Sequence, residues 1–206
     1  FIVSGFQSLQ ALSDEPCRPF DAHRKGINLG ECAAAILLTS KPEKLGVTPR
    51  VCITGGGFSN DANHISGPSR TGEELASAIQ QALDESGISK NDIDIVSAHG
   101  TATRYNDEME AKAFGLMNLE RKPINSLKGY FGHTLGAAGI AEVAINAEAL
   151  IRGELIPSKG FDTLGVPQDL NIIRNLENKR LKTCLKTASG FGGCNAAIIL
   201  QMETNF

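Results

Sequence analysis

The chain has 206 residues, of which 41% are hydrophobic, and this is enough to bury the core of one globular domain or of two small ones. With 20 basic and 23 acidic residues the formal charge is −3, so the sequence lacks the broad positive charge that nucleic-acid binding requires. No stretch reaches the roughly 18 apolar residues of a membrane span, so we expect no membrane association.

The five cysteines show no CxxC spacing, and four of them lie in apolar or glycine-rich surroundings where we expect them to be buried. This usage indicates a reducing compartment, and we expect a cytoplasmic protein. Arg18, Arg24 and Lys25 could form a small basic patch for an acidic partner, although three basic residues on a loop are more often ordinary solvated surface.

The first half of the chain contains two short apolar runs, at 31–40 and 50–59, which are bounded by glycine or proline. They predict strands that are buried on both faces. Residues 72–87 predict an amphipathic helix because Leu75, Ile79 and Leu83 recur at four-residue spacing, and Gly87 should end it.

The second half continues with alternating strands and helices. We expect a strand at 92–100, a helix from near Asn106, a short strand at 123–126 and a long helix at 134–153. Two apolar runs that are joined by Gly192-Gly193 predict a closing β-hairpin. The order of these elements predicts the α/β class, with a mixed sheet covered by helices.

His99 directly follows an apolar strand, and ligands of open α/β sheets gather at the carboxyl ends of strands. A lone histidine more often hydrogen-bonds a turn, but His133 occupies a second, glycine-rich turn just before the long helix. A helix N-terminus carries about half a positive charge, which favours a neutral imidazole that donates one N–H. The sequence therefore suggests oxyanion stabilisation, whereas tight helix packing would explain the small residues but not the histidine.

Lys128 lies five residues before His133 among apolar or small residues, and a buried ammonium group must be paired. Glu110 is the candidate partner. A capping role is an equally good interpretation, in which Asn106 or Asp107 accepts backbone N–H bonds and Glu110 reaches back.

Other polar and aromatic side chains could line the same site. Thr101 and Thr103 alternate after His99 and could point hydroxyl groups toward a polar, chain-like ligand. Phe191 would lie at the mouth of the crevice if its hairpin abuts the His99 strand, although core packing is an alternative role. A metal site is not expected, because the possible ligands show no HxxxH or HExxH spacing; they are His99, Asp107, Glu110 and His133.

Four motifs carry a resemblance to a known family: "RPFDAHRKGINLGE", "AHGTATRYNDEMEAKA", "SLKGYFGHTLGAAG" and "SGFGGCNAAI". Together they resemble the β-ketoacyl-acyl carrier protein synthases, the condensing enzymes of fatty acid and polyketide synthesis, and they follow the family order along essentially the whole chain. The resemblance implies a thiolase-like fold with a mixed five-stranded sheet covered by helices, forming one half of a layered αβαβα architecture.

The resemblance also implies a decarboxylating Claisen condensation, in which malonyl-acyl carrier protein loses carbon dioxide and attacks an acyl thioester held on a cysteine. His99 and His133 correspond to the two family histidines that face the malonyl thioester. Lys128, Asp107 and Glu110 match family positions too, which favours a Lys128–Glu110 pair.

The remaining matches concern the substrate. Thr101 and Thr103 fall where the family contacts the phosphopantetheine arm of the carrier protein, the only cofactor expected. Phe191, followed by Gly192, falls where the family places a gating ring beside the oxyanion hole.

None of the five cysteines matches the nucleophile motif, which in the family lies upstream in a chain roughly twice as long; Cys194 comes closest, but we expect it in the core. Residues 1–206 are therefore expected to be the C-terminal thiolase-like domain, inactive alone. Its expected partners are the N-terminal half, acyl carrier protein and, at full length, a second copy. The alternative is a non-catalytic partner subunit that resembles chain-length factors, but the retained histidines and Lys128 favour the enzyme.

Overall fold

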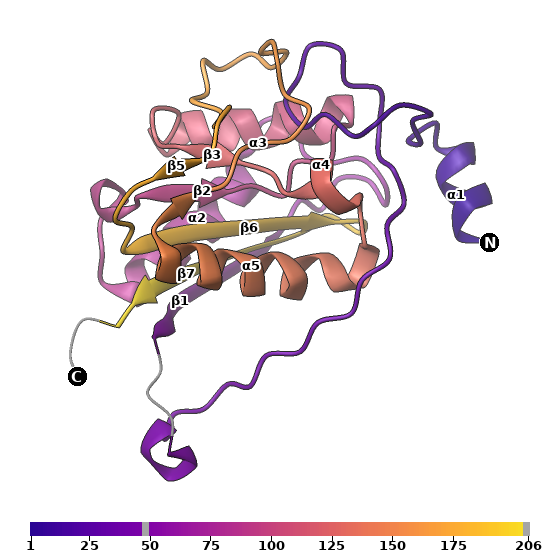
Figure 1. The fold of residues 1–206 in the computed structure, drawn as a ribbon. Coiled ribbons are helices and arrows are strands. Elements are labelled where there is room, and N and C mark those ends of the chain that lie inside the picture. The colour runs from indigo at the N-terminus through magenta and orange to yellow at the C-terminus, as the bar shows by residue number, and fades with distance from the viewer. Residues whose placement is uncertain (47–49, 204–206) are drawn as a thin grey trace.

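The computed structural model of the protein describes residues 1–46 and 50–203, and its centre is one five-stranded sheet (Figure 1). The strand order is β1-β7-β6-β2-β3; β2 is parallel to β3 and β6, whereas β7 is antiparallel to β1 and β6. The sheet is therefore mixed, as the sequence predicts. Its strands are β1 (Val51–Asn60), β2 (Ile95–Ser97), β3 (Ile124–Asn125), β6 (Thr183–Gly190) and β7 (Cys194–Met202).

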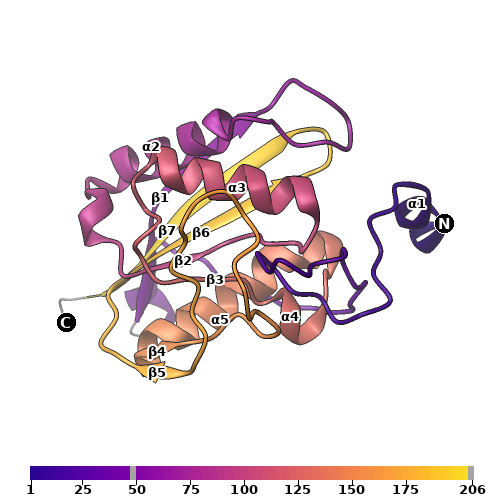
Figure 2. The ribbon, with the colours of Figure 1, turned by 90° about the horizontal axis from the view of Figure 1, so that it is seen from above.

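Helices cover both faces of this sheet. Figure 2 shows α2 (Glu73–Ser86) and α3 (Arg104–Leu116) on one face and α5 (Ala138–Arg152) on the other. The larger apolar core lies under α2 and α3, and a smaller one lies under α5. The short elements are α1 (Ile2–Ser8), η1 (Pro42–Leu45), η2 (Lys90–Asp92), α4 (Lys128–Phe131), η3 (Leu135–Ala137), β4 (Glu154–Leu155) and β5 (Glu177–Asn178).

The glycine run of β1 allows α2 to pack directly on the strand. A Cβ atom at Gly55 would lie 2.1 Å from the Ala82 carbonyl oxygen, and one at Gly57 would lie 2.1 Å from that of Ala78. Since side chains alternate across a strand, Gly56 faces away from the helix. The buried face of α2 and its end at Gly87, which adopts a left-handed conformation, confirm the predicted amphipathic helix.

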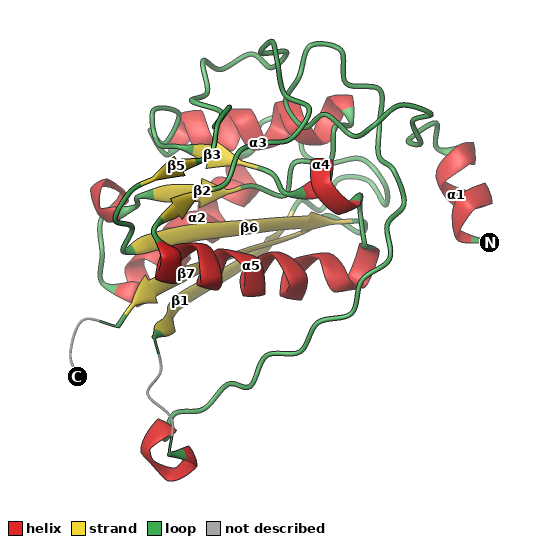
Figure 3. Ribbon diagram, viewed as in Figure 1, coloured by secondary structure: helices red, strands yellow, loops and turns green. Residues whose placement is uncertain are grey.

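Two expectations for the first half of the chain are wrong. Residues 31–40 form an extended loop rather than a strand (Figure 3), with Leu37 78% and Leu38 69% exposed. The described part of the chain places no strand beside this segment, and an apolar run alone does not create a ladder. β1 is an edge strand with a partly exposed surface, so it is not buried on both faces.

The cysteines also depart from expectation, since Cys17 and Cys184 are buried but Cys32 and Cys194 are exposed. Cys194 is the first residue of β7, beside the hairpin turn, and it is exposed, so its expected place in the core is wrong. Among the described residues, no helix is both long and apolar enough to cross a bilayer.

Candidate active site

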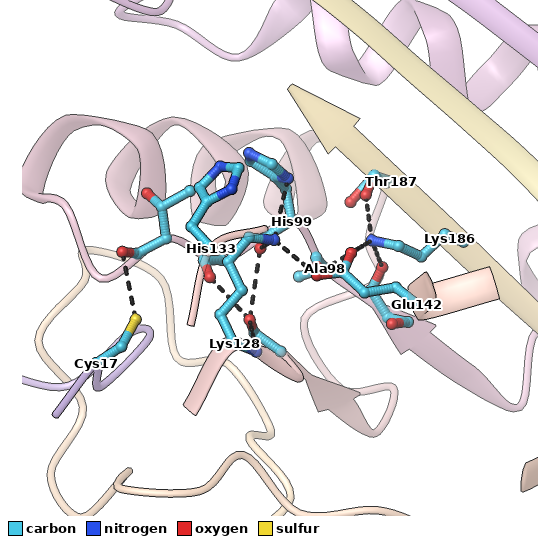
Figure 4. A network of polar contacts seen from close by, with 12 residues as sticks. Cys17, Ala98, His99, Lys128, His133, Glu142, Lys186 and Thr187 are labelled. Atoms are coloured by element: carbon cyan, nitrogen blue, oxygen red, sulfur yellow. Dashed lines mark hydrogen bonds and ion pairs between the residues drawn. The ribbon is translucent and has the colours of Figure 1, made fainter. Parts of the chain in front are cut away.

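The parallel pairing of β2 with β3 and β6 brings three strand ends to one edge of the sheet. His99 follows β2, and Lys128 begins α4 just after β3. His133 returns to this edge through the turn after α4, where its backbone N–H donates to the Asn28 carbonyl. The ring centroids of His99 and His133 lie 5.2 Å apart with an interplanar angle of 82° (Figure 4), so the two predicted histidines converge.

Hydrogen bonds to the Nδ1 atoms fix the tautomer of each imidazole. Nδ1 of His133 accepts the backbone N–H of Leu135 at 3.0 Å. Nδ1 of His99 lies 3.3 Å from Nζ of Lys128, and an ammonium group can only donate. Each neutral ring must therefore carry its proton on Nε2, so the site holds two N–H donors of the same kind.

Burial keeps both rings neutral. Desolvation, followed by the positive charge of Lys128, lowers the pKa of His99 well below its ordinary value of 6.5. The same two causes, in the same order, lower the pKa of His133 to about 4. The neutral form is as expected, but its cause differs from the expected helix terminus: α5 begins only at Ala138, after the 3₁₀ turn of η3.

The predicted Lys128–Glu110 ion pair is wrong. The fully buried Lys128 places Nζ 2.7 Å from Oε1 of Glu142 on α5, and 2.5 Å from the His99 carbonyl oxygen. Glu142 was missed by sequence reasoning, although a carboxylate among the small, apolar residues at the start of the predicted helix is a signal, because it must find a partner when it is buried.

Glu110 instead binds the turn that carries His99. Its two carboxylate oxygens accept the backbone N–H groups of His99 at 2.8 Å and Gly100 at 2.6 Å. The hydroxyl of Thr187 on β6 lies 3.1 Å from Oε1, and the amide of Asn106 donates to Oε2 at 2.9 Å. With its oxygens occupied in this way, Glu110 determines the course of the backbone rather than pairing with the lysine.

Asp107 ties the loop after Cys17 to the same turn. Its oxygens accept the backbone N–H groups of Thr101 at 2.9 Å and Phe20 at 2.7 Å, while Arg24 Nε lies 3.8 Å away. Burial raises the pKa of this carboxyl group to about 6. The capping interpretation is wrong, since α3 begins at Arg104. Arg24 is 6% exposed, so it is no part of a surface patch.

The candidate substrate residues lie at the edge of this cluster. Thr101 is buried and Thr103 half-buried, and their hydroxyl oxygens lie 2.8 Å apart. Phe191 is in the hairpin turn at the same edge of the sheet, but it is 56% exposed and stacks on Phe6 with centroids 5.6 Å apart. Gly192 donates its N–H to the Ile65 carbonyl at 2.6 Å. Phe191 and Gly192 thus remain outside the buried histidine cluster.

Two further residues complete the surroundings of the site. Lys186 on β6, which sequence reasoning missed, is buried and lies 2.8 Å from Oε2 of Glu142. A lysine in the middle of a predicted strand was the available signal. Cys17 places Sγ 3.6 Å from the Thr101 carbonyl, and burial raises the pKa of its thiol to about 12, so it is a poor nucleophile. Over residues 1–46 and 50–203, no three metal-ligating side chains gather closely enough to hold an ion.

Comparison with known proteins shows the family to which the chain belongs. The profile of the β-ketoacyl synthase C-terminal domain matches residues 51–162, more than half of the chain. A 3-oxoacyl-acyl-carrier-protein synthase 2 of Rhizobium meliloti is 33% identical over 215 residues, which cover 98% of this chain and 51% of the relative. A polyketide biosynthesis malonyl-ACP decarboxylase of Bacillus subtilis is 32% identical over 203 residues, with coverages of 96% and 48%.

A solved structure of a type II polyketide synthase acyl-carrier protein in complex with its ketosynthase superposes with a TM-score of 0.92 at 28% identity. The match covers 98% of this chain and 53% of that one, and it confirms the thiolase-like fold. The chain spans about half the length of the relatives that it matches. The chain belongs to the β-ketoacyl synthase family, and it matches the C-terminal domain of that family.

Proposed function

We propose that this chain supplies the two-histidine half of an active site for decarboxylating Claisen condensation. The substrate is a malonyl group carried on the phosphopantetheine arm of an acyl carrier protein, and the acceptor is an acyl thioester on a cysteine. The observation that carries the proposal is the pair of neutral imidazoles, 5.2 Å apart, whose Nδ1 atoms are occupied and whose Nε2–H groups are donors.

Two such donors suit the charge that develops in the reaction. When the malonyl thioester loses carbon dioxide, the electron pair of the broken C–C bond moves into the thioester, and the carbonyl oxygen becomes an enolate. Fixed N–H donors in a water-poor site stabilise this oxyanion more than the uncharged carbonyl. The enolate carbon then attacks the acyl thioester, a new C–C bond forms, and the cysteine leaves as a thiolate.

The other site residues have supporting roles in this proposal. Thr101 and Thr103 would contact the phosphopantetheine arm, and Phe191 with Gly192 would border the oxyanion hole. Lys128, Glu110 and Asp107 hold the turns that carry the donors. No cofactor besides the carrier arm is needed for this chemistry.

The nucleophilic cysteine is proposed to come from polypeptide outside these 206 residues. Cys17 is a protonated, buried thiol, and the exposed Cys194 lies on the hairpin. We therefore propose that residues 1–206 are a C-terminal domain whose partners are the N-terminal half, a second copy in a homodimer, and acyl carrier protein. The solved complex of a ketosynthase with its carrier protein supports that last partner.

A non-catalytic partner subunit is the second candidate, favoured because the described residues place no reactive thiol beside the imidazoles. The buried lysines and carboxylates argue against it, because maintaining two desolvated neutral imidazoles serves no purpose in a subunit without chemistry.

The test replaces His133 with alanine in the assembled synthase, meaning this chain together with the polypeptide that supplies the nucleophile. Release of carbon dioxide from malonyl-acyl carrier protein should fall by about 10²- to 10³-fold, the usual effect of losing one oxyanion donor. Acyl transfer to the cysteine should remain. His64→Ala, at an exposed histidine, is the control. Decarboxylation at the parental rate in His133→Ala would remove the role from His133.

A further inference from the structure

Lys186 forms a second buried ion pair with the carboxylate that holds Lys128. Its side chain is 3% exposed, and Nζ lies 2.8 Å from Oε2 of Glu142, while Nζ of Lys128 lies 2.7 Å from Oε1 (Figure 4). Each oxygen of one carboxylate therefore has its own ammonium group. The described residues bring no second carboxylate within ion-pair distance of either lysine.

The two lysines also bind consecutive carbonyl groups of the backbone that leads to His99. Lys186 Nζ lies 3.3 Å from the carbonyl oxygens of both Ser97 and Ala98, and Lys128 Nζ lies 2.5 Å from that of His99. β2 ends at Ser97, so the sheet does not fix the carbonyls of Ala98 and His99. The two lysines therefore hold the backbone in place beyond the end of β2, in the turn that carries His99.

We propose that Lys186 is a positioning residue for the imidazoles: it takes one oxygen of Glu142 and the carbonyls before His99, and it adds a second positive charge, besides that of Lys128, near both rings. This inference rests on the proposed function. Two ammonium groups that share one carboxylate repel a third positive charge, so an imidazolium is disfavoured and the neutral Nε2–H donors are retained. The positive charge of Lys186 also attracts an enolate.

The charges that surround the imidazoles come from four elements. Lys128 approaches from α4, Glu142 from α5, Lys186 from β6, and Glu110 and Asp107 from α3. Glu110 and Asp107 are occupied by the backbone N–H groups of His99, Gly100, Thr101 and Phe20. The shared Glu142 is thus the carboxylate through which a change at Lys186 is transmitted to Lys128.

A purely structural role for Lys186 makes a different prediction. If the lysine only satisfies the carbonyls of Ser97 and Ala98, its removal should lower stability and turnover at every pH alike. If its charge keeps the imidazoles neutral, its removal should also raise their pKa values. The acid limb of the pH–rate profile for decarboxylation would then move to higher pH.

The experiment measures carbon dioxide release from malonyl-acyl carrier protein between pH 4 and 8 with the assembled synthase. In Lys186→Met the acid limb should move up by about one pH unit, a shift typical of losing one nearby like charge. Lys186→Arg, which retains a positive charge, should restore the parental limb. Lys182→Met, at an exposed lysine just before the same strand, controls for the loss of a charge elsewhere.

The outcomes separate this inference from the proposed function. If the parental synthase releases no carbon dioxide, the proposed function fails. If it does, and the acid limb of Lys186→Met coincides with the parental limb, the role of Lys186 is wrong. Should Lys186→Met not fold, Lys186→Gln takes its place, since it keeps a donor but no charge. Failure of both uncharged variants to fold would assign Lys186 to folding alone and overturn the inference.

Discussion

His133 should make the stability of this protein depend on pH, and the size of the effect follows from its surroundings. The imidazole has an ordinary pKa of 6.5 in the unfolded chain, whereas burial and Lys128 lower it to about 4 in the fold. Between these values the unfolded chain binds one proton more than the folded protein, so stability decreases as the pH falls from 6.5 to 4. The difference of about 2.5 units corresponds to about 3 kcal/mol.

The perturbation that isolates this effect is His133→Asn. The asparagine side chain does not titrate, and its amide oxygen can accept the Leu135 N–H that Nδ1 accepts in the parent. The parent should therefore lose about 3 kcal/mol relative to the variant between pH 7 and pH 4, while above pH 7 the difference between them should be constant. His99 is present in both proteins, and its contribution cancels to first order.

The assay is urea unfolding of the assembled protein, followed by far-UV circular dichroism at pH 7, 6, 5 and 4. The free energy of unfolding is compared between parent and variant at each pH. His64→Asn, at an exposed imidazole, should leave that comparison unchanged across the range. A constant difference between the parent and His133→Asn from pH 7 to pH 4 would refute the reasoning, because it would mean that the folded ring titrates as freely as the unfolded one.

Two further predictions concern stability at neutral pH. Glu142→Gln leaves two buried ammonium groups without a carboxylate, so it should lower the free energy of unfolding by about 3–5 kcal/mol, whereas Glu148→Gln, in an exposed pair on the same helix, should change it by less than about 1 kcal/mol. Gly57→Ala should cost about 1–3 kcal/mol because its Cβ would lie 2.1 Å from the Ala78 carbonyl oxygen of α2. Gly56→Ala is its control, because a Cβ atom at Gly56 would have no heavy atom nearer than 3.7 Å, which is ordinary van der Waals contact. Equal urea midpoints for the two alanine variants would contradict the packing of α2 on β1.

The elements that the sequence predicts correctly are those whose signal is local. α2 has an apolar stripe at helical spacing and a terminal glycine, and the β6–β7 hairpin has two apolar runs around Gly192 and Gly193, both with positive φ angles. Residues 31–40 carry an equally apolar signal, but a strand needs a neighbour that supplies hydrogen bonds. Apolar composition indicates that a surface should be covered, and it does not identify what covers it.

The sequence was enough to predict which histidines form the site. It was not enough to predict which carboxylate pairs with the buried lysine. The ends of parallel strands meet at one edge of a sheet, so a histidine after β2 was a sound candidate from position alone. The choice between Glu110 and Glu142 for Lys128 depends on which face of the sheet each helix covers, and α3 and α5 lie on opposite faces. A one-dimensional pattern holds no such information.

β6 shows how the fold resolves that choice. Successive side chains of a strand point to opposite faces, so Lys186 reaches Glu142 on the α5 side while Thr187 reaches Glu110 on the α3 side. The turn of His99 is thereby held from both sides: carboxylate oxygens of Glu110 accept its N–H groups, and the ammonium groups of Lys128 and Lys186 donate to its carbonyls. The turn could not rotate without breaking bonds on both faces. Burying so many charges is costly compared with apolar packing, and a rigid, neutral pair of N–H donors is the property that apolar packing could not provide.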